Sequence, residues 1–408
     1  MKRFSSKNFD FSKANELTDS LCQSCVSNGM SVFHESQNVP VHSVLNMATR
    51  EQALDYPKGA ISLGFCDQCG FISNLCFDPD QLEYSSNCEE SQGFSPTFNE
   101  FSRGLATYLI EKYDLHQKDI LEIGCGKGEF LNLLCELGDN RGVGFDPAYV
   151  RGRSTGETAK RIAFIRDFYS EKYAGYQADF VCCKMTLEHI QGTADFVSTV
   201  RRSIGNRLDT VVFFQVPDVT RILGDCAFED IYYEHCSYFT PGSLGKLFRN
   251  CGFNVFSLET AYDDQYLMIE AKPANGDFLP PLPQENDLEE LKILIESFQA
   301  KLQRKLSYWQ ERLQKGRTNG HRVVLWGSGS KGVAFLTTLE IYDEIKYVVD
   351  INRYRQGNYM AGTGQEIVAP GFLQKYRPDL VIIMNAVYRQ EIEQDLQRMG
   401  LSPELLTI

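Results

Sequence analysis

The sequence predicts an α/β protein with two Rossmann-like blocks behind a small cysteine-rich segment. From about residue 90 to residue 272, short apolar runs alternate with helical segments, and the alternation returns near the C-terminus. The first 88 residues hold six of the 13 cysteines. A polar, proline-rich stretch, KPANGDFLPPLPQEND, separates the two blocks as a linker. We therefore predict domains at residues 1–88, 89–272 and 273–408.

Composition narrows the classes of partner. The 408 residues include 41 basic and 54 acidic side chains, a net charge of −13, which disfavours binding to nucleic acid or an anionic membrane. No apolar run approaches the roughly 18 residues of a membrane helix, and the basic start MKRFSSKNFDFSKANEL lacks the apolar stretch of a signal peptide. We expect a cytoplasmic protein whose cysteines are mostly reduced, so close pairs indicate metal ligands.

Two CxxC pairs lie in the first segment, Cys22-Gln-Ser-Cys25 and Cys66-Asp-Gln-Cys69. This doubled spacing is typical of a closed, tetrahedral Cys₄ zinc site, which would stabilise a segment too small for a core of its own. Four free thiols or a redox pair are the alternatives. A neighbouring side chain could also replace one ligand; the candidates are Cys76, Cys88, His34 and His42.

A glycine-rich loop opens the middle block. A predicted strand, Ile120–Ile123, runs into Gly124-Cys-Gly126-Lys-Gly128, and a predicted helix, Glu129–Leu137, follows. Glycines there let the backbone approach a ligand closely, and Asp146 at the end of the next strand could accept hydrogen bonds from a ribose. The loop and the acid predict a binding site for a ligand that contains a nucleoside, and several kinds of nucleotide-binding α/β domain could provide such a site. The other strands expected in this block are Gly142–Phe145, Ala163–Arg166, Asp179–Lys184, Thr210–Val216 and a hairpin of Asn254–Leu258 with Tyr266–Ala271.

Ionisable side chains follow the fourth and fifth of these strands. The fourth runs into Met185-Thr-Leu-Glu188-His189, and a later loop reads Tyr232-Tyr-Glu234-His235. The carboxyl ends of parallel strands meet at one edge of a sheet, where ligands bind. Histidine beside carboxylates and phenols suits general-base chemistry near neutral pH. A single histidine in an aromatic loop can equally be structural.

The C-terminal block begins with one long amphipathic helix from Leu288 to Leu313, which either packs between domains or self-associates. A second glycine loop, Gly327-Ser-Gly329-Ser-Lys331-Gly332, has true GxGxxG spacing, and Asp350 follows 21 residues after Gly329. This loop could bind NAD, bind a pyrophosphate, or be a turn without a ligand. The strands expected here are Arg322–Trp326, Lys346–Asp350 and Leu380–Met384.

The first glycine loop and its acidic partner resemble class I S-adenosylmethionine-dependent methyltransferases. The resemblance implies that the loop glycines hold the amino-acid end of the cofactor, that Asp146 holds its ribose and that Asp167 lies near the adenine. The residues expected to bind the cofactor are Glu122, Gly124, Gly126, Gly128, Asp146, Asp167 and Met185.

Over the whole chain, the order of cysteine segment, methyltransferase core with Tyr-x-Glu-His loop, and second α/β block resembles one family. These are the sugar-nucleotide C-methyltransferases of branched deoxysugar biosynthesis. The resemblance implies His235 as base, with Glu234, Tyr232, His189 and Tyr84 around the substrate. It also implies that the C-terminal block helps to hold the nucleotide diphosphate of the substrate, through Gly327, Gly329, Lys331 and Tyr354.

The predicted activity is therefore transfer of a methyl group from S-adenosylmethionine to a carbon, C3, of a nucleotide-linked 4-keto deoxysugar through an enolate. The expected cofactors are S-adenosylmethionine and a structural zinc ion. Two alternatives stay open: an O- or N-methyltransferase for another small metabolite, and a non-catalytic zinc-containing binding protein. The sequence does not distinguish a monomer from a dimer.

Overall fold

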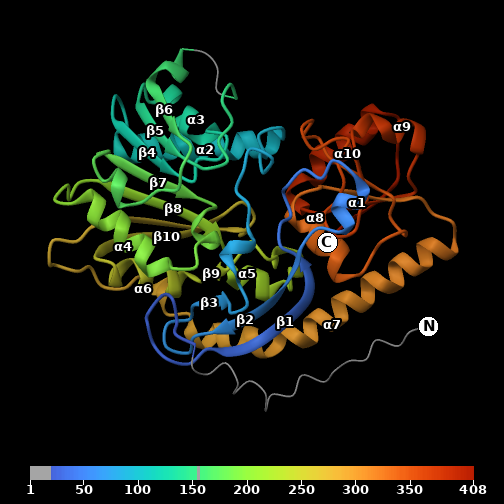
Figure 1. Cartoon of the computed structure of the whole chain (residues 1–408), viewed down its shortest axis with the longest axis horizontal. Coiled ribbons are helices and arrows are strands. Elements are labelled where there is room, and N and C mark those ends of the chain that lie inside the picture. Colours follow the sequence, from blue (N-terminus) through green and yellow to red (C-terminus); the bar gives the residue numbers. More distant parts are fainter. Residues whose placement is uncertain (1–19, 154–156) are drawn as a thin grey trace.

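The computed structural model describes residues 20–153 and 157–408, and its strands form three sheets. Figure 1 shows the central sheet on the left, the C-terminal block on the right and the N-terminal strands between and below them. Within the described part of the chain, no helix has both the length and the apolar character needed to cross a membrane.

The N-terminal sheet has the order β1-β2-β3-β9 with antiparallel pairing throughout. Its last strand, β9, comes from the middle of the chain, so the N-terminal block and the predicted methyltransferase block share one sheet. One short helix, α1 (Arg50–Leu54), follows the first strand. The strands are β1 (Ser31–Pro40), β2 (Lys58–Phe65), β3 (Ile72–Asn74) and β9 (Ser237–Tyr238).

The central sheet has the order β10-β11-β8-β7-β4-β5-β6. The five strands β4, β5, β6, β7 and β8 run parallel, and the hairpin β10–β11 joins antiparallel to β8. The strand order reverses between β4 and β7, which places a ligand-binding crevice at their carboxyl ends. The strands are β4 (Asp119–Ile123), β5 (Arg141–Phe145), β6 (Ile162–Ile165), β7 (Phe180–Lys184), β8 (Val211–Pro217), β10 (Phe253–Ala261) and β11 (Tyr266–Pro273).

The sequence located this sheet well. The five predicted parallel strands are confirmed to within one residue at each end, and the helix Glu129–Leu137 is confirmed at both ends. The helices of this block are α2 (Pro96–Tyr113), α3 (Glu129–Leu137), α4 (Thr193–Ile204), α5 (Val219–Gly224) and α6 (Pro241–Asn250).

The C-terminal sheet is parallel throughout, in the order β14-β13-β12-β15-β16. The predicted strands correspond to β12, β13 and β15, whereas the sequence did not predict β14 and β16. The elements are β12 (Val323–Trp326), α8 (Ser330–Thr338), β13 (Tyr347–Val349), β14 (Glu366–Val368), α9 (Leu373–Tyr376), β15 (Leu380–Ile383), α10 (Arg389–Arg398) and β16 (Glu404–Thr407).

The long helix α7 (Leu288–Thr318) runs along the lower edge of the molecule toward the C-terminal block (Figure 1). Its apolar stripe, including Phe298 and Trp309, is buried in a core shared with the N-terminal sheet, α5 and the C-terminal sheet. Phe298 contacts the ring of Phe33 on β1, and Trp309 contacts Phe335 on α8. The stripe is thus used within the chain, which confirms packing between domains over self-association.

Candidate active site

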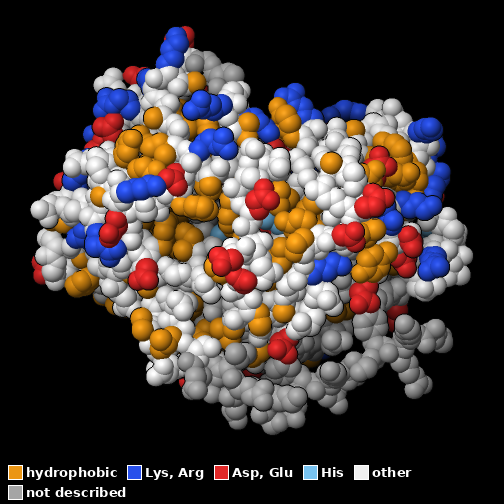
Figure 2. All heavy atoms as spheres, viewed as in Figure 1, with side chains coloured by type: hydrophobic (Ala, Val, Ile, Leu, Met, Phe, Trp, Pro, Cys, Tyr) orange, Lys and Arg blue, Asp and Glu red, His pale blue; other side chains and the backbone are white. Residues whose placement is uncertain are grey.

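One cavity of about 750 Å³ lies where the three blocks meet. Its walls combine the first glycine loop, the ends of β7 and β8, the Tyr232–His235 loop and the second glycine loop. In Figure 2 histidine side chains are visible inside a hollow near the middle of the face. Both glycine loops therefore open into one space, although about 200 residues separate them in the chain.

The first glycine loop connects β4 to α3. Gly124, Gly126 and Gly128 have φ angles of 69°, 53° and 83°, in the left-handed region that favours glycine. A Cβ atom at Gly124 would lie 2.0 Å from Oγ1 of Thr186. Gly124 and Gly126 line the cavity, whereas Gly128 is the N-cap of α3 and turns the chain into the helix.

The acids predicted to hold a nucleoside lie at the ends of neighbouring strands. The carboxylate of Asp146, after β5, accepts hydrogen bonds from the backbone N–H groups of Gly126 (2.8 Å) and Ala148 (2.7 Å). Asp167, after β6, accepts the hydroxyl of Tyr173 at 2.6 Å. Both line the cavity. A carboxylate has about four acceptor positions, so Asp146 retains capacity for a ribose.

Glu122 and Lys184 lie beneath this loop. Glu122 is 2% exposed, and burial raises the pKa of its carboxyl to about 7. Burial lowers the pKa of the Lys184 ammonium to about 8, and its Nζ lies 3.6 Å from the ring centre of Phe130. Met185, the next residue, has φ of 50° and lines the cavity. The structure thus brings every predicted cofactor residue except Gly128 to the cavity wall.

The predicted catalytic side chains form one cluster. The Tyr232 hydroxyl and the His235 Nε2 lie 2.8 Å apart. His189 Nδ1 lies 3.0 Å from the backbone oxygen of Glu234, so in the neutral ring Nδ1 donates and Nε2 is the acceptor. The rings of His189 and His235 meet edge to face at 4.9 Å. Tyr84 reaches the same cluster, with its ring centre 6.3 Å from that of His189.

Burial governs the charges in this cluster. It lowers the pKa of His189 to about 4 and lowers that of His235 well below the ordinary value, so both imidazoles are neutral at pH 7. Burial also raises the pKa of Glu188 to about 8 and raises that of Tyr232 well above 10. Glu188 Oε1 lies 4.0 Å from His235 Nε2. Two neutral imidazoles, a phenol and a carboxylic acid therefore face the cavity.

Glu234 differs from these neutral groups, because its partners Ser43 and His42 keep its carboxylate ionised. Its Oε1 accepts hydrogen bonds from the backbone N–H (2.6 Å) and the hydroxyl (2.7 Å) of Ser43. His42 Nδ1 lies 3.2 Å from the same oxygen. Burial opposes charge on both groups, but the ion pair prevails and lowers the pKa of Glu234. Burial likewise disfavours the His42 imidazolium, but Cys88 and Glu234 raise its pKa to about 10.

The second glycine loop differs from the first in the hydrogen bonds that its aspartate, Asp350, accepts. Asp350 accepts hydrogen bonds from the backbone N–H groups of Ser328 (3.0 Å) and Asn352 (2.8 Å), and from the Ser328 hydroxyl. Buried Arg355 donates to the Ser328 hydroxyl at 2.7 Å. Lys331 lines the cavity but donates to the carboxylate of Asp230 in the central block.

Gly327 and Gly329 also line the cavity, but Tyr354 does not. Tyr354 is 38% exposed. The guanidinium of Arg153 lies over its ring, 3.6 Å from the ring centre. Of the residues predicted to hold the nucleotide diphosphate, the structure thus brings three to the cavity and leaves the fourth outside.

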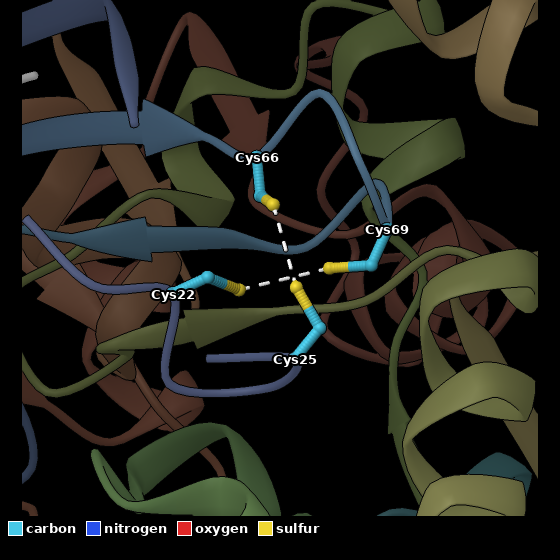
Figure 3. Close-up of side chains that lie close together, drawn as sticks. All are labelled: Cys22, Cys25, Cys66 and Cys69. Atoms are coloured by element: carbon cyan, nitrogen blue, oxygen red, sulfur yellow. Dashed lines mark hydrogen bonds between the residues drawn. The ribbon is translucent and has the colours of Figure 1, made fainter. Parts of the chain in front are cut away.

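The four predicted metal ligands converge from two loops (Figure 3). Their sulfur atoms all lie within 4.8 Å of one another. The Cys22–Cys69 and Cys25–Cys66 sulfur pairs are 3.6 and 3.7 Å apart, close to the roughly 3.8 Å edge of a tetrahedron with Zn–S bonds of about 2.3 Å. None of the proposed substitutes completes the set. Cys76 is exposed, Cys88 and His42 contact each other, and His34 packs on Phe298.

Sequence reasoning did not identify several residues at the site. His42 was considered only as a metal ligand, and Ser43, Glu89 and Arg355 were not considered. No motif marks these positions, because each reaches the site from another block through the fold. The buried Glu89 carboxylate, for example, accepts hydrogen bonds from Arg153 (2.5 Å) and Asn352 (3.0 Å).

Comparisons with known proteins indicate the class of enzyme. Residues 97–258 match a family model described as a methyltransferase domain, and residues 283–402 match one described as a C-methyltransferase C-terminal domain. C-methyltransferase NovU of Streptomyces niveus is 26% identical over 304 residues, which are 71% of this chain and 72% of that protein.

Among solved structures, magnesium protoporphyrin IX methyltransferase from Synechocystis PCC 6803 with bound SAH is 13% identical. The alignment covers 44% of this chain and 84% of that one, with a TM-score of 0.34. Human N-acetylserotonin methyltransferase in complex with SAM is 16% identical, with 43% and 55% of the chains covered and a TM-score of 0.34.

The domain match and the sheet order define a class I S-adenosylmethionine-dependent methyltransferase, which confirms the predicted fold class. The C-terminal match and the relative specify the reaction further. The chain is an S-adenosylmethionine-dependent C-methyltransferase.

Proposed function

We propose that this enzyme methylates a carbon next to the keto group of a nucleotide-linked 4-keto deoxysugar, at C3. The observation that carries the proposal is the shared cavity of about 750 Å³, which joins a cofactor loop, an imidazole–phenol cluster and a second glycine loop. That space can hold a cofactor and a second, extended substrate side by side. The imidazole–phenol cluster lines the same cavity as the two loops, so a substrate bound there would bring its reacting carbon near both the cluster and the cofactor.

The residues of the cluster suit enolate chemistry. A C–H bond beside a ketone is acidic only when the charge can move to the oxygen, so a base and a hydrogen-bond donor are both needed. His235 is the proposed base because burial keeps its imidazole neutral. Its Nε2 is paired with the Tyr232 hydroxyl. When the ketone oxygen takes over that hydroxyl, Tyr232 stabilises the enolate and leaves Nε2 free for the proton.

His189 has a different role in this proposal. Since its Nδ1–H is donated to the backbone oxygen of Glu234, its Nε2 is an acceptor and cannot stabilise an enolate oxygen. It therefore orients a substrate hydroxyl, and Tyr84 closes the same side of the cavity. S-adenosylmethionine, when bound at Gly124, Gly126 and Asp146, supplies the electrophilic methyl group.

The experiment is a mass-spectrometric screen of nucleotide keto-sugars with isotope-labelled S-adenosylmethionine. We expect the label on carbon, together with exchange of the α-hydrogen in D₂O, and the loss of both in His235→Asn. Label on oxygen or nitrogen without α-exchange would favour the alternative methyltransferases. Full exchange and turnover in His235→Asn would show that another group, with His189 the nearest candidate, is the base.

We also propose that Cys22, Cys25, Cys66 and Cys69 hold a structural zinc ion. Four sulfur ligands fill a tetrahedral site and leave no position for water, so the metal would stabilise the N-terminal block. Elemental analysis of the purified chain should find one zinc per molecule, and Cys66→Ser should lose it and lower the melting temperature. A stoichiometry near zero with unchanged melting would exclude the metal.

A further inference from the structure

His42 and Ser43 of the N-terminal block directly contact Glu234 in the Tyr232–His235 loop of the central block. Both bind the same carboxylate oxygen of Glu234, at 3.2 Å from His42 Nδ1 and 2.7 Å from the Ser43 hydroxyl. All three side chains are buried, with exposures of 1%, 2% and 2%. A buried carboxylate with charged and hydrogen-bonding partners has one fixed orientation, because leaving it unpaired costs several kcal/mol.

The contact continues from Glu234 to the imidazoles. The Glu234 backbone oxygen accepts the Nδ1–H of His189, which sets both the orientation and the tautomer of that ring. His235 follows Glu234 in the chain, and the next backbone N–H, that of Cys236, donates to the backbone oxygen of Glu188 at 2.9 Å. Fixing the Glu234 side chain therefore fixes a short turn that carries both imidazoles.

We propose that His42 and Ser43 are positioning residues for the reaction: they anchor Glu234 and, through its backbone, hold His189 and His235 in place. The N-terminal block is then part of the catalytic apparatus rather than a separate module. The inference rests on the proposed function, in which these imidazoles face the substrate.

Ser43 also connects to the C-terminal block. Its hydroxyl lies 2.7 Å from that of Ser330, the first residue of α8 after the second glycine loop. One serine thus joins Glu234 of the central block to the loop proposed to hold the nucleotide end of the substrate. Because a single hydroxyl hydrogen is available at Ser43, Ser330 acts as the donor when Ser43 donates to Glu234.

The charge state of His42 gives a test that needs no substrate. Its ring faces Glu234 and Cys88, with Tyr84 beside it and His189 close enough for electrostatic coupling. The pair is therefore an imidazolium and a carboxylate at about pH 8, which lies between the ordinary histidine pKa of about 6.5 and the His42 value of about 10.

The first measurement is ¹⁵N NMR of the imidazoles in the full chain, which has six histidines. We expect both ring nitrogens of His42 to be protonated at about pH 8, and His42 to become neutral in Glu234→Gln. The spectrum should also show His189 protonated at Nδ1, with that preference weakened in Ser43→Ala. A neutral His42 in the wild-type chain, or an unchanged His189 in Ser43→Ala, would overturn the inference.

The second measurement is kinetic and uses Ser43→Ala, because removing the buried imidazole of His42 puts the fold at risk. Misplaced catalytic groups lower turnover by about tenfold to hundredfold, so kcat should fall by that factor while the dissociation constant for S-adenosylmethionine stays unchanged. Ser62→Ala is the matched control, since Ser62 is a buried serine of the same block. Wild-type kcat in Ser43→Ala would contradict the inference.

These outcomes separate the two proposals. If no nucleotide keto-sugar is methylated by the wild-type enzyme, the proposed substrate is wrong, but the NMR result still decides whether His42 and Ser43 anchor the loop. If methylation occurs and Ser43→Ala matches the wild type in both experiments, the function stands and the positioning role is excluded.

Discussion

The two glycine loops of this enzyme look alike in sequence and differ in what their acids do. Each loop follows the first of a set of parallel strands, β4 or β12, and an aspartate, Asp146 or Asp350, comes directly after the next strand. Asp146 accepts two backbone N–H groups and lies open to the cavity. Asp350 also lines the cavity, but it accepts three hydrogen bonds from Ser328 and Asn352 of its own loop, and its Oδ2 lies 4.0 Å from Nε of Arg355.

The difference shows that glycine spacing alone does not identify a dinucleotide site. The second loop has the GxGxxG pattern, yet its own loop takes three of the roughly four acceptor positions of its acid, so less capacity is left for a ribose than at Asp146. Its third glycine serves close packing, since a Cβ at Gly332 would lie 2.4 Å from the Gly327 oxygen. The loop that departs from the pattern is the one whose acid has more acceptor positions free, which favours the first loop as the cofactor site.

The largest expected effect comes from Gly124→Ala. At φ of 69° a Cβ atom would lie 2.0 Å from Oγ1 of Thr186, so the loop must move out of the conformation that exposes it to the cavity. We expect the affinity for S-adenosylmethionine to fall by at least about a hundredfold, since the backbone approach is lost. Calorimetric titration measures this, and affinity near the wild-type value would refute the assignment of the loop.

Asp146→Asn should have the next largest effect. Hydrogen bonds to a charged group contribute about 1.5–3 kcal/mol, so the dissociation constant for S-adenosylmethionine should rise by about tenfold to hundredfold. The matched variant is Asp350→Asn, for which the same titration should give the wild-type value. If the two variants weakened cofactor binding equally, the distinction between the loops would fail.

Much of the fold behind this comparison could be predicted from the sequence, because the relevant patterns are formed by residues close together in the chain. The alternation of apolar runs located the five parallel strands, and the doubled CxxC spacing located four sulfur atoms that do converge. These signals depend on neighbours in the chain. The N-terminal sheet was not predicted, because its strand β9 is supplied from residues 237–238, far along the sequence.

The contacts of the Tyr232–His235 loop show the same limit. The pairing of Glu234 with His42 and Ser43 spans about 190 residues, and no motif in either segment announces it. Tyr354 is the converse case, since the resemblance placed it with the substrate, whereas the fold puts it under Arg153 outside the cavity. Contacts between blocks depend on how the sheets pack, which local patterns do not encode.

A smaller effect is expected on stability from Asp350→Asn. The change leaves the Ser328 loop and buried Arg355 with a weaker partner, and loss of a buried charge costs the folded state up to about 3–5 kcal/mol. We expect a lower melting temperature by calorimetry, with Asp146→Asn less affected because Asp146 is paired with backbone groups alone. Equal melting temperatures for both variants would mean that Asp350 is not structural.

The smallest effect is expected from Gly329→Ala, which makes it the sharpest contrast to Gly124→Ala. Gly329 has φ of −72°, a value that alanine adopts readily, and a Cβ there would meet no atom of the described residues within 4 Å. The variant should melt and bind S-adenosylmethionine like the wild type. Since the new methyl group would point into open space beside the cavity, a raised KM for the nucleotide substrate with unchanged kcat would mark this loop as part of the substrate site. Unchanged KM would limit the loop to joining the blocks through Ser330 and Ser328.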